Sequence, residues 1–151
     1  MSASMDTLKT RDTSKVSSKP DRIKPRRNAP RVFQVHNLRT QAMVAHRVEV
    51  ADRGPARSRG LLGRQTLGEG EGLWIVPCEA VHTVGMRFAI ELVFLDRRNV
   101  VRKVRSSVPA WRLSGCLRAR SVLELAAGTL KSTPVYPGDI LQFSPASPLQ
   151  I

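Results

Sequence analysis

Two cysteines and one histidine are the residues of this sequence best suited to metal or thiol chemistry. Cys78 and His82 lie four positions apart, and Cys116 follows much later in the chain. Thiolate and imidazole groups are common zinc ligands, and a zinc site needs three or four of them. A zinc site at Cys78, His82 and Cys116 therefore requires a fold that brings Cys116 beside the other two. The sequence has no CxxC pair, and the alternative is two buried or half-exposed thiols with an ordinary loop histidine.

The same three residues are also compatible with a thiol-dependent enzyme. His82 could take the proton of Cys78 or Cys116 if it lay within hydrogen-bond reach of that thiol. The sequence places no third group to orient the histidine, so we assign no catalytic residue.

A second group of residues favours ligand binding. Arg87 and Glu91 belong to one alternating segment, and residues four apart in a strand lie about 13 Å from each other, so the two cannot pair directly. Glu124 could pair with Arg87 if their strands were neighbours. Trp111 stands in a predicted loop, where an aromatic ring could contact a ligand or a protein partner. We expect a small polar cleft at His82, Arg87, Glu91 and Trp111. The alternative for the charged residues is a structural ion pair or a solvated face.

Three arginines accompany two glycines in the segment RSRGLLGR. Exposed backbone amides beside glycines can bind an anion, but a phosphate-binding loop would continue with Gly-Lys-Ser or Gly-Lys-Thr. This segment does not, so a solvated basic helix is the favoured interpretation of Arg57, Arg59 and Arg64.

The positive charge of the chain is concentrated at its beginning. The 151 residues carry a formal net charge of +13, and residues 1–30 hold eight basic side chains against three acidic ones. This segment has almost no apolar residues, so we expect a disordered basic arm. Its residues 9–27 could bind nucleic-acid phosphates or another anionic surface weakly and without sequence preference, because nothing in the pattern predicts base readout.

The remaining residues, 31–151, suffice for one domain with one hydrophobic core. The sequence has no apolar run of membrane-spanning length and no apolar stretch typical of a secretory signal. We therefore expect a cytoplasmic protein with reduced cysteines.

Short strands separated by turns dominate the domain. Residues 32–36 form a brief strand, and residues 42–50 alternate so that Val44, His46 and Val48 share one face, which predicts a buried His46. Residues 52–64 predict a loop and a short helix ending near Gly63, and residues 73–76 a compact strand in which Trp74 belongs to the core. Further strands are expected at residues 122–126 and 140–143, with a turn at 137–139 between them and a long loop at 106–120.

The most regular element is the segment 86–96. Met86, Phe88, Ile90, Leu92 and Phe94 alternate onto one face, which predicts a strand with that face in the core and the other half covered. Asp96 and Asn99 suit a reversing turn, and Asn tolerates the left-handed conformation found there. Residues 100–105 then complete a hairpin. Turn signals at this spacing indicate an antiparallel sandwich or barrel.

Three blocks of the sequence together resemble the bacterial and archaeal family called domain of unknown function 192. The blocks are RGLLGR at 59–64, VHTVGMRFAIELVFLD at 81–96, and SVLELAAGTL at 121–130 with PGDIL at 137–141. The resemblance implies a compact, jelly-roll-like β-sandwich with one or two short helices. It implies no activity or catalytic residue. The sequence departs from the family pattern at Glu91, where Asp is more frequent, and at Asn99, where Gly is common.

Three functional hypotheses follow from these observations. The leading hypothesis is a non-catalytic binding or accessory module with the polar cleft described above, for a small ligand or a protein partner. The second is a metal- or thiol-dependent enzyme using Cys78, His82 and Cys116. The third is a non-specific binder of nucleic acid or anionic surfaces through the basic arm.

Overall fold

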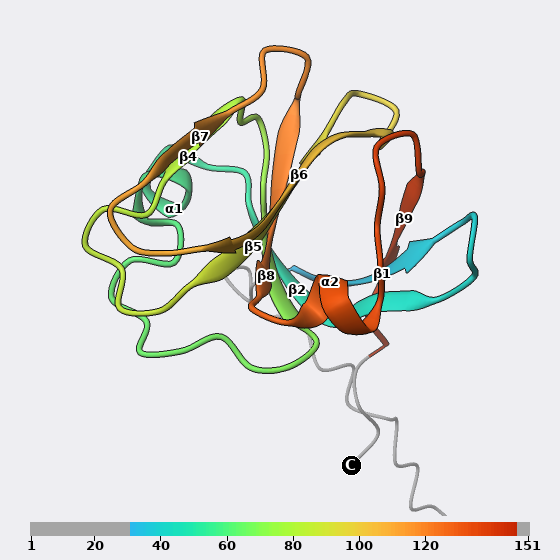
Figure 1. The fold of residues 1–151 in the computed structure, drawn as a ribbon, viewed down its shortest axis with the longest axis horizontal. Helices are drawn as coiled ribbons and strands as arrows, with labels where there is room; N and C mark the ends of the chain where they lie inside the picture. Colours follow the sequence, from blue (N-terminus) through green and yellow to red (C-terminus); the bar gives the residue numbers. More distant parts are fainter. Residues whose placement is uncertain (1–30, 148–151) are drawn as a thin grey trace, which may run out of the picture.

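The computed structural model describes residues 31–147, and the predicted basic arm at residues 1–30 lies outside this range. The prediction of a mainly β protein with short helices is confirmed. The described chain contains nine strands and two helices (Figure 1). Along the sequence these elements are β1 (Val32–Asn37), β2 (Met43–Ala51), α1 (Gly54–Arg59), β3 (Glu71–Ile75), β4 (Ala80–His82), β5 (Ile90–Leu95), β6 (Val101–Val108), β7 (Leu113–Gly115), β8 (Ser121–Ala126), α2 (Thr129–Ser132) and β9 (Leu141–Pro145).

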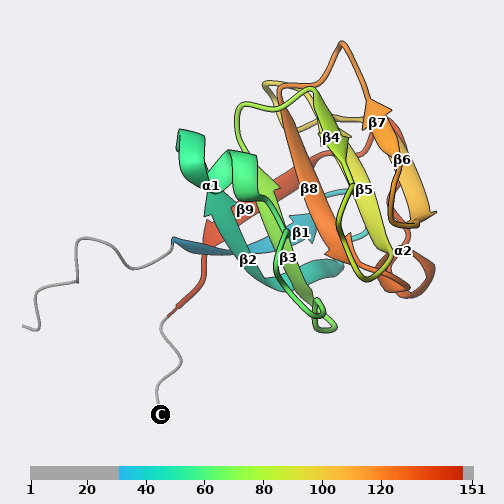
Figure 2. The same ribbon diagram turned by 90° about the vertical axis from the view of Figure 1, so that its left-hand side faces the viewer.

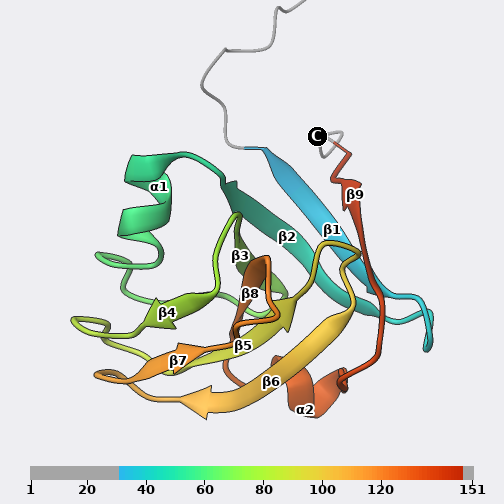
Figure 3. The ribbon, with the colours of Figure 1, turned by 90° about the horizontal axis from the view of Figure 1, so that it is seen from above.

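Seven strands form one curled sheet in the order β6-β5-β8-β3-β2-β1-β9. Its two outermost strands approach each other, because Val100 bridges Ile140 and the amide of Val101 donates to the carbonyl of Asp139 at 2.8 Å. The sheet therefore closes into a barrel at this end. The remaining strands, β4 and β7, form an antiparallel two-stranded ribbon, here called the outer ribbon. Seen from above, this ribbon lies on the same side of the molecule as α1 (Figure 3).

The curled sheet separates two hydrophobic cores. The barrel core lies inside the curl and includes Val35, Val93 and Leu123. The outer core lies on the other side of the sheet, beneath the outer ribbon and the α1 region, and includes Leu92 and Val122. Figure 2 views the molecule from the side that carries α1 and β4. Strands β5 and β8 stand between the two cores, so every residue in both is buried. Sequence analysis expected the second face of β5, which carries Val93 and Leu95, to be only half covered. This face packs into the barrel core and is fully buried.

The predicted strand at 86–96 is correct in its second half. Ile90 and Leu92 face the outer core as expected, with Phe88 packed against it. Strand β5 begins only at Ile90, since the amide of Met86 donates to the carbonyl of Thr83 in a turn. The hairpin to β6 is confirmed, and Asn99 has the left-handed φ of 58° that its turn requires.

One strand pair differs from the antiparallel arrangement that the sequence predicted. β2 and β3 are parallel, with Val48 opposite Gly72 and Val50 opposite Trp74. Parallel neighbours need a crossover connection, and the segment containing α1 provides it. The helix ends at Arg59, with Gly60 at φ 50°, and not near Gly63 as predicted.

Two short strands were missed by sequence analysis. The predicted loop at 106–120 contains the end of β6 and the whole of β7, and β7 pairs with β4. Three-residue strands show too little alternation to be recognised from a sequence.

The prediction of a buried His46 is wrong, because this side chain is exposed. Strand β2 contains irregularities opposite β1, where Val35 pairs with Ala45 and His36 with Met43. Val44 and Ala45 are consequently both buried, and the alternation assumed from the sequence is interrupted. Trp74 does pack against the barrel core, stacked on Phe143 with ring centroids 3.9 Å apart.

A buried carboxylate holds β1 to the turn before β9. Asp139 accepts hydrogen bonds from the side chain of Asn37 at 2.7 Å and the amide of Tyr136 at 3.0 Å, and it forms an ion pair with Arg39. The Arg39 hydrogen bond, together with those of Tyr136 and Asn37, lowers the pKa of Asp139 to about 2. This network closes the barrel beside the Val100 bridge.

Candidate functional site

Glu124 is the most unusual side chain on the outer face of the sheet. It lies in the middle of β8, opposite Leu73 of β3 on one side and Leu92 of β5 on the other. Its register places it among the apolar residues of the outer core, and only 3% of the residue is exposed. Burial of a carboxyl group among apolar neighbours is unfavourable unless hydrogen bonds or charges compensate.

That compensation is incomplete. The Oε2 atom of Glu124 has no hydrogen-bond partner among the described residues. Burial raises the pKa of Glu124 from 4.5 to about 7, and the positive charge of Arg64 opposes the rise. Arg64 itself is paired with Glu49 at 2.7 Å. The carboxyl group therefore changes its charge near neutral pH and keeps an unused acceptor.

Glu124 borders a cleft between the α1 region, β3 and β4, here called the Glu124 cleft. Its volume is about 400 Å³, within the range of small-ligand sites. One set of lining residues is apolar and comes from several elements: Leu61, Leu62, Ile75, Val81 and Met86. The other lining side chains are polar or charged and include Arg57, Arg59, Cys78, Glu79 and His82.

The structure brings Cys78 and His82 to this cleft, but Cys116 does not line it. The amide of Cys116 donates to the carbonyl of Glu79 at 2.8 Å, so the two loops are adjacent, and both thiols pack against the outer core. Among residues 31–147, no three His, Cys, Asp or Glu side chains are grouped closely enough to hold a metal ion. The predicted zinc ligands therefore do not form a set in the described fold.

Cys78 also lacks the surroundings of an activated nucleophile. Its thiol donates to the carbonyl of Ala80 at 3.1 Å. Burial raises the pKa of this thiol, whereas a nucleophilic thiol needs a lowered one. The environment of Cys78 favours a neutral, partly buried side chain.

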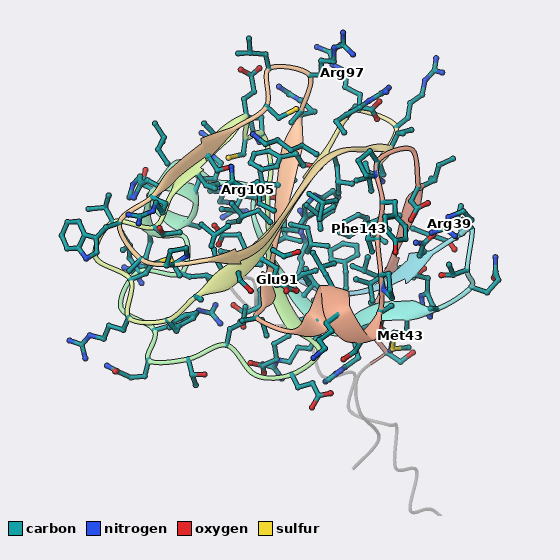
Figure 4. All side chains as sticks on the ribbon, in the orientation of Figure 1. Arg39, Met43, Glu91, Arg97, Arg105 and Phe143 are labelled. Carbon is teal, nitrogen blue, oxygen red and sulfur yellow. The ribbon has the colours of Figure 1, made fainter. Side chains whose placement is uncertain are left out.

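Glu91, predicted to lie in the polar cleft, has a different location. Its carboxylate accepts the amides of Gly128 at 3.1 Å and Leu130 at 2.7 Å, and it lies next to α2 in Figure 4. Glu91 pairs with Leu125, so its side chain leaves the sheet on the face opposite to Glu124. The residue holds the start of α2 against the sheet and is only 2% exposed.

Arg87 and Trp111 lie at the surface. The guanidinium of Arg87 donates to the side chain of Gln65 at 3.0 Å, so the predicted pair with Glu124 is not formed. Trp111 is 66% exposed beyond the end of the outer ribbon, where its amide donates to the carbonyl of Thr83 at 3.0 Å. Of the four residues expected in one cleft, His82 alone lines the Glu124 cleft.

A larger groove of about 840 Å³ lies between β2, the segment 66–70 and α2. Among its lining residues are His46 and Glu69, both exposed. None of the buried unpaired polar atoms of residues 31–147 belongs to it. The chemistry therefore favours the smaller Glu124 cleft as the candidate site.

Sequence reasoning considered Glu124 only as a partner for Arg87. The available signal was an acidic residue at the centre of the apolar run VLELA. A carboxyl group in a strand buried on both sides must either find donors or remain unpaired, and this choice depends on residues distant in the sequence.

A barrel with an outer ribbon and a lateral cleft is the framework that these observations define. The chain belongs to the domain of unknown function 192 family (DUF192, Uncharacterized ACR), which it matches over residues 35–143. This confirms the resemblance seen in the sequence. No curated protein matches the chain.

Two solved structures share the fold. One is a protein from Sinorhizobium meliloti described as a "putative transcription regulator", with a TM-score of 0.67 and 20% identity, covering 76% of this chain and 94% of that one. The other is a protein of unknown function from Novosphingobium aromaticivorans, with a TM-score of 0.64 and 18% identity, covering 74% and 83%. At these identities the similarity establishes the fold alone.

Proposed function

We propose that this domain is a non-catalytic binding module whose Glu124 cleft takes a small ligand with an apolar body and a hydrogen-bond donor. The observation that carries the proposal is the unpaired Oε2 of Glu124 in a cleft of about 400 Å³. A ligand that donates to this oxygen supplies the hydrogen-bond partner that residues 31–147 do not. Unsatisfied buried acceptors are rare in native proteins, and binding is a physical reason to keep one.

The rest of the lining supports the same ligand chemistry. Leu61 and Val81 are buried and apolar, and they suit a hydrocarbon portion of the ligand. His82 and Glu79 are exposed and can contact polar groups near solvent. An amine, amide or hydroxyl attached to a small aliphatic or aromatic body fits this distribution.

The other predicted partners remain proposals. Trp111 is exposed enough to contact a protein partner. The contact of residues 9–27 with nucleic acid stays a prediction, because that segment lies outside the described residues. The unpaired thiols of Cys78 and Cys116 suit a reducing compartment, and we expect the protein to act in the cytoplasm.

Binding can be tested with three small probes of one size: butylamine, butanol and butyrate. Backbone amide signals of the ¹⁵N-labelled full chain are followed by NMR during each titration at pH 8, where Glu124 is mainly ionised. We expect shifts at residues 60–62, 78–82 and 123–125, with butylamine strongest and butyrate weakest, because the carboxylate accepts from a donor and repels an anion.

Glu124→Gln should remove this preference for the amine while keeping the shape of the cleft. Glu69→Gln is the matched control, since Glu69 is an exposed acid outside the cleft. If all three probes shift the same residues equally in wild type and in E124Q, Glu124 does not select the ligand and the proposal fails.

A further inference from the structure

A third pocket of the molecule is lined mainly by arginines. It lies between the turn that joins β5 to β6 and the loop that joins β7 to β8, and its volume is about 410 Å³. Figure 4 shows Arg97 of the first turn at the top of the molecule. Five arginines line this arginine pocket: Arg97, Arg98, Arg102, Arg118 and Arg120.

The backbone on both sides of the pocket is held by hydrogen bonds. The carboxylate of Asp96 accepts the amides of Arg98 at 2.8 Å and Val100 at 3.0 Å. The amide of Arg120 donates to the carbonyl of Leu95 at 2.7 Å, which ties the second loop to the end of β5. The two loops therefore present their arginines from fixed positions.

Charge compensation inside the pocket is incomplete. Arg102 forms an ion pair with Asp96 at 2.5 Å. Within residues 31–147, no carboxylate lies within ion-pair distance of the other four lining arginines. Guanidinium groups gathered in this way repel one another, and an anion bound between them would relieve the repulsion.

We propose that the arginine pocket binds a small ligand carrying two or more phosphate groups. Guanidinium groups offer paired N–H donors that match phosphate oxygens, and arginines from two loops can contact successive phosphates of one ligand. The arginines surround a pocket, and two acidic side chains, Asp96 and Glu79, also line it. This clustering around one pocket fits a compact oligophosphate better than the extended phosphate backbone of a nucleic acid, which is typically bound by a basic face or stripe.

The proposal does not rest on the Glu124 cleft. Glu79 lines both pockets, so its carboxylate marks the boundary between the two. Phosphate binding at the arginines and donor binding at Glu124 can each be present without the other.

Isothermal titration calorimetry of the full chain with inorganic tripolyphosphate, pyrophosphate and orthophosphate tests the proposal. We expect affinity to rise from orthophosphate to tripolyphosphate, because each added phosphate engages a further arginine. Arg98→Ala and Arg118→Ala should each weaken tripolyphosphate binding by roughly tenfold, as expected for a lost charge-assisted hydrogen bond.

Arg105→Ala is the matched control for these variants. Arg105 is an exposed arginine of β6 that does not line the pocket, and Figure 4 shows it well below Arg97. Arg105→Ala removes the same charge as the pocket variants but no contact with the ligand. We expect the affinity for tripolyphosphate to fall by less than about twofold, through the lost long-range attraction alone. Equal losses in Arg98→Ala, Arg118→Ala and Arg105→Ala would assign the binding to net charge and overturn the proposal.

Two further measurements complete the test. Thermal melting without phosphate should show both pocket variants at least as stable as wild type, which separates lost binding from unfolding. Binding of a single-stranded oligothymidylate is measured in the same way, with wild type and with Arg98→Ala. The part of the binding that Arg98→Ala removes should be weaker for the oligothymidylate than for tripolyphosphate. Stronger arginine-dependent binding of the oligonucleotide, or no tripolyphosphate binding, would overturn the proposal.

Discussion

Glu91 and Glu124 are carboxyl groups on adjacent strands of one sheet, buried to nearly the same extent, with exposures of 2% and 3%. Their surroundings differ completely. Glu91 accepts two backbone amides at the start of α2, whereas Oε2 of Glu124 has no partner among the described residues. Burial of an acid is therefore not by itself a sign of function. The absence of a donor, together with an adjoining cleft, distinguishes Glu124 from a structural carboxylate.

Asp139 extends the comparison to a third buried carboxyl. Hydrogen bonds and the Arg39 ion pair lower its pKa to about 2, while burial without sufficient partners raises the pKa of Glu124 to about 7. The two shifts have opposite signs because the ionised form is favoured by donors in the first case and disfavoured by desolvation in the second.

The largest expected effect comes from removing the satisfied carboxylate. Glu91→Ala should lower the free energy of unfolding by about 3 to 4 kcal/mol, since it leaves the amides of Gly128 and Leu130 without their acceptor and creates a cavity. Urea denaturation followed by circular dichroism measures this loss. Glu69→Ala, at an exposed position, should change stability by less than about 0.5 kcal/mol. A loss below about 1 kcal/mol in Glu91→Ala would show that α2 does not depend on this residue.

The unsatisfied carboxyl should respond in the opposite direction. Glu124→Gln should raise the free energy of unfolding at pH 8 by up to about 3 kcal/mol, because each unit of pKa shift corresponds to about 1.4 kcal/mol. The raised pKa means that the folded protein holds the proton more tightly than the unfolded chain. This difference contributes to the free energy of unfolding. The contribution is complete below pH 4.5 and is lost as the pH rises to about 7, where the folded protein releases the proton.

The free energy of unfolding of wild type should therefore fall between pH 4.5 and 7 because Glu124 loses its proton. Glu124→Gln lacks this group and should not show this part of the fall. Urea midpoints of both proteins across this range measure the difference. Parallel profiles for the two proteins would contradict the assigned environment of Glu124.

The smallest effect concerns the charge that opposes the shift. Arg64→Met removes the positive charge acting on Glu124, so the pKa of Glu124 should rise further. The cost in stability at pH 8 should stay below about 1 kcal/mol, because Arg64 and Glu49 are partly exposed. Carboxyl ¹³C chemical shifts followed with pH measure the pKa. The control Arg47→Met removes a different ion pair and should leave the pKa of Glu124 unchanged. An equal rise of this pKa in both variants would show that the effect is not specific to Arg64.

Much of the local structure could be predicted from neighbouring residues. The alternation through Ile90 and Leu92 predicted their shared core, and Asp96 with Asn99 predicted the turn between β5 and β6. The failures have local causes as well. Irregular pairing in β2 moved His46 to the surface, and three-residue strands such as β4 carry too little pattern to be recognised.

The candidate site was only partly predictable, because its chemistry depends on pairing between distant segments. The residue types suggested polar sites, and His82 does reach the cleft. The sequence did not show which buried carboxylate would find hydrogen-bond donors. The donors to Glu91 are the amides of residues 128 and 130, and Arg87 donates to Gln65 and not to Glu124.

By itself the sequence determined that the chain would have a mainly β fold and belong to the domain of unknown function 192 family, because alternation, turn residues and family motifs are local properties. Only the tertiary structure decided that Oε2 of Glu124, beside a cleft, has no hydrogen-bond partner among residues 31–147. It also decided that, among the same residues, four of the five arginines lining one pocket have no carboxylate within ion-pair distance. Both outcomes depend on the order of the strands and on loops that are distant in the sequence but adjacent in the fold. These long-range contacts determine which hydrogen-bond and ion-pair partners each group can reach.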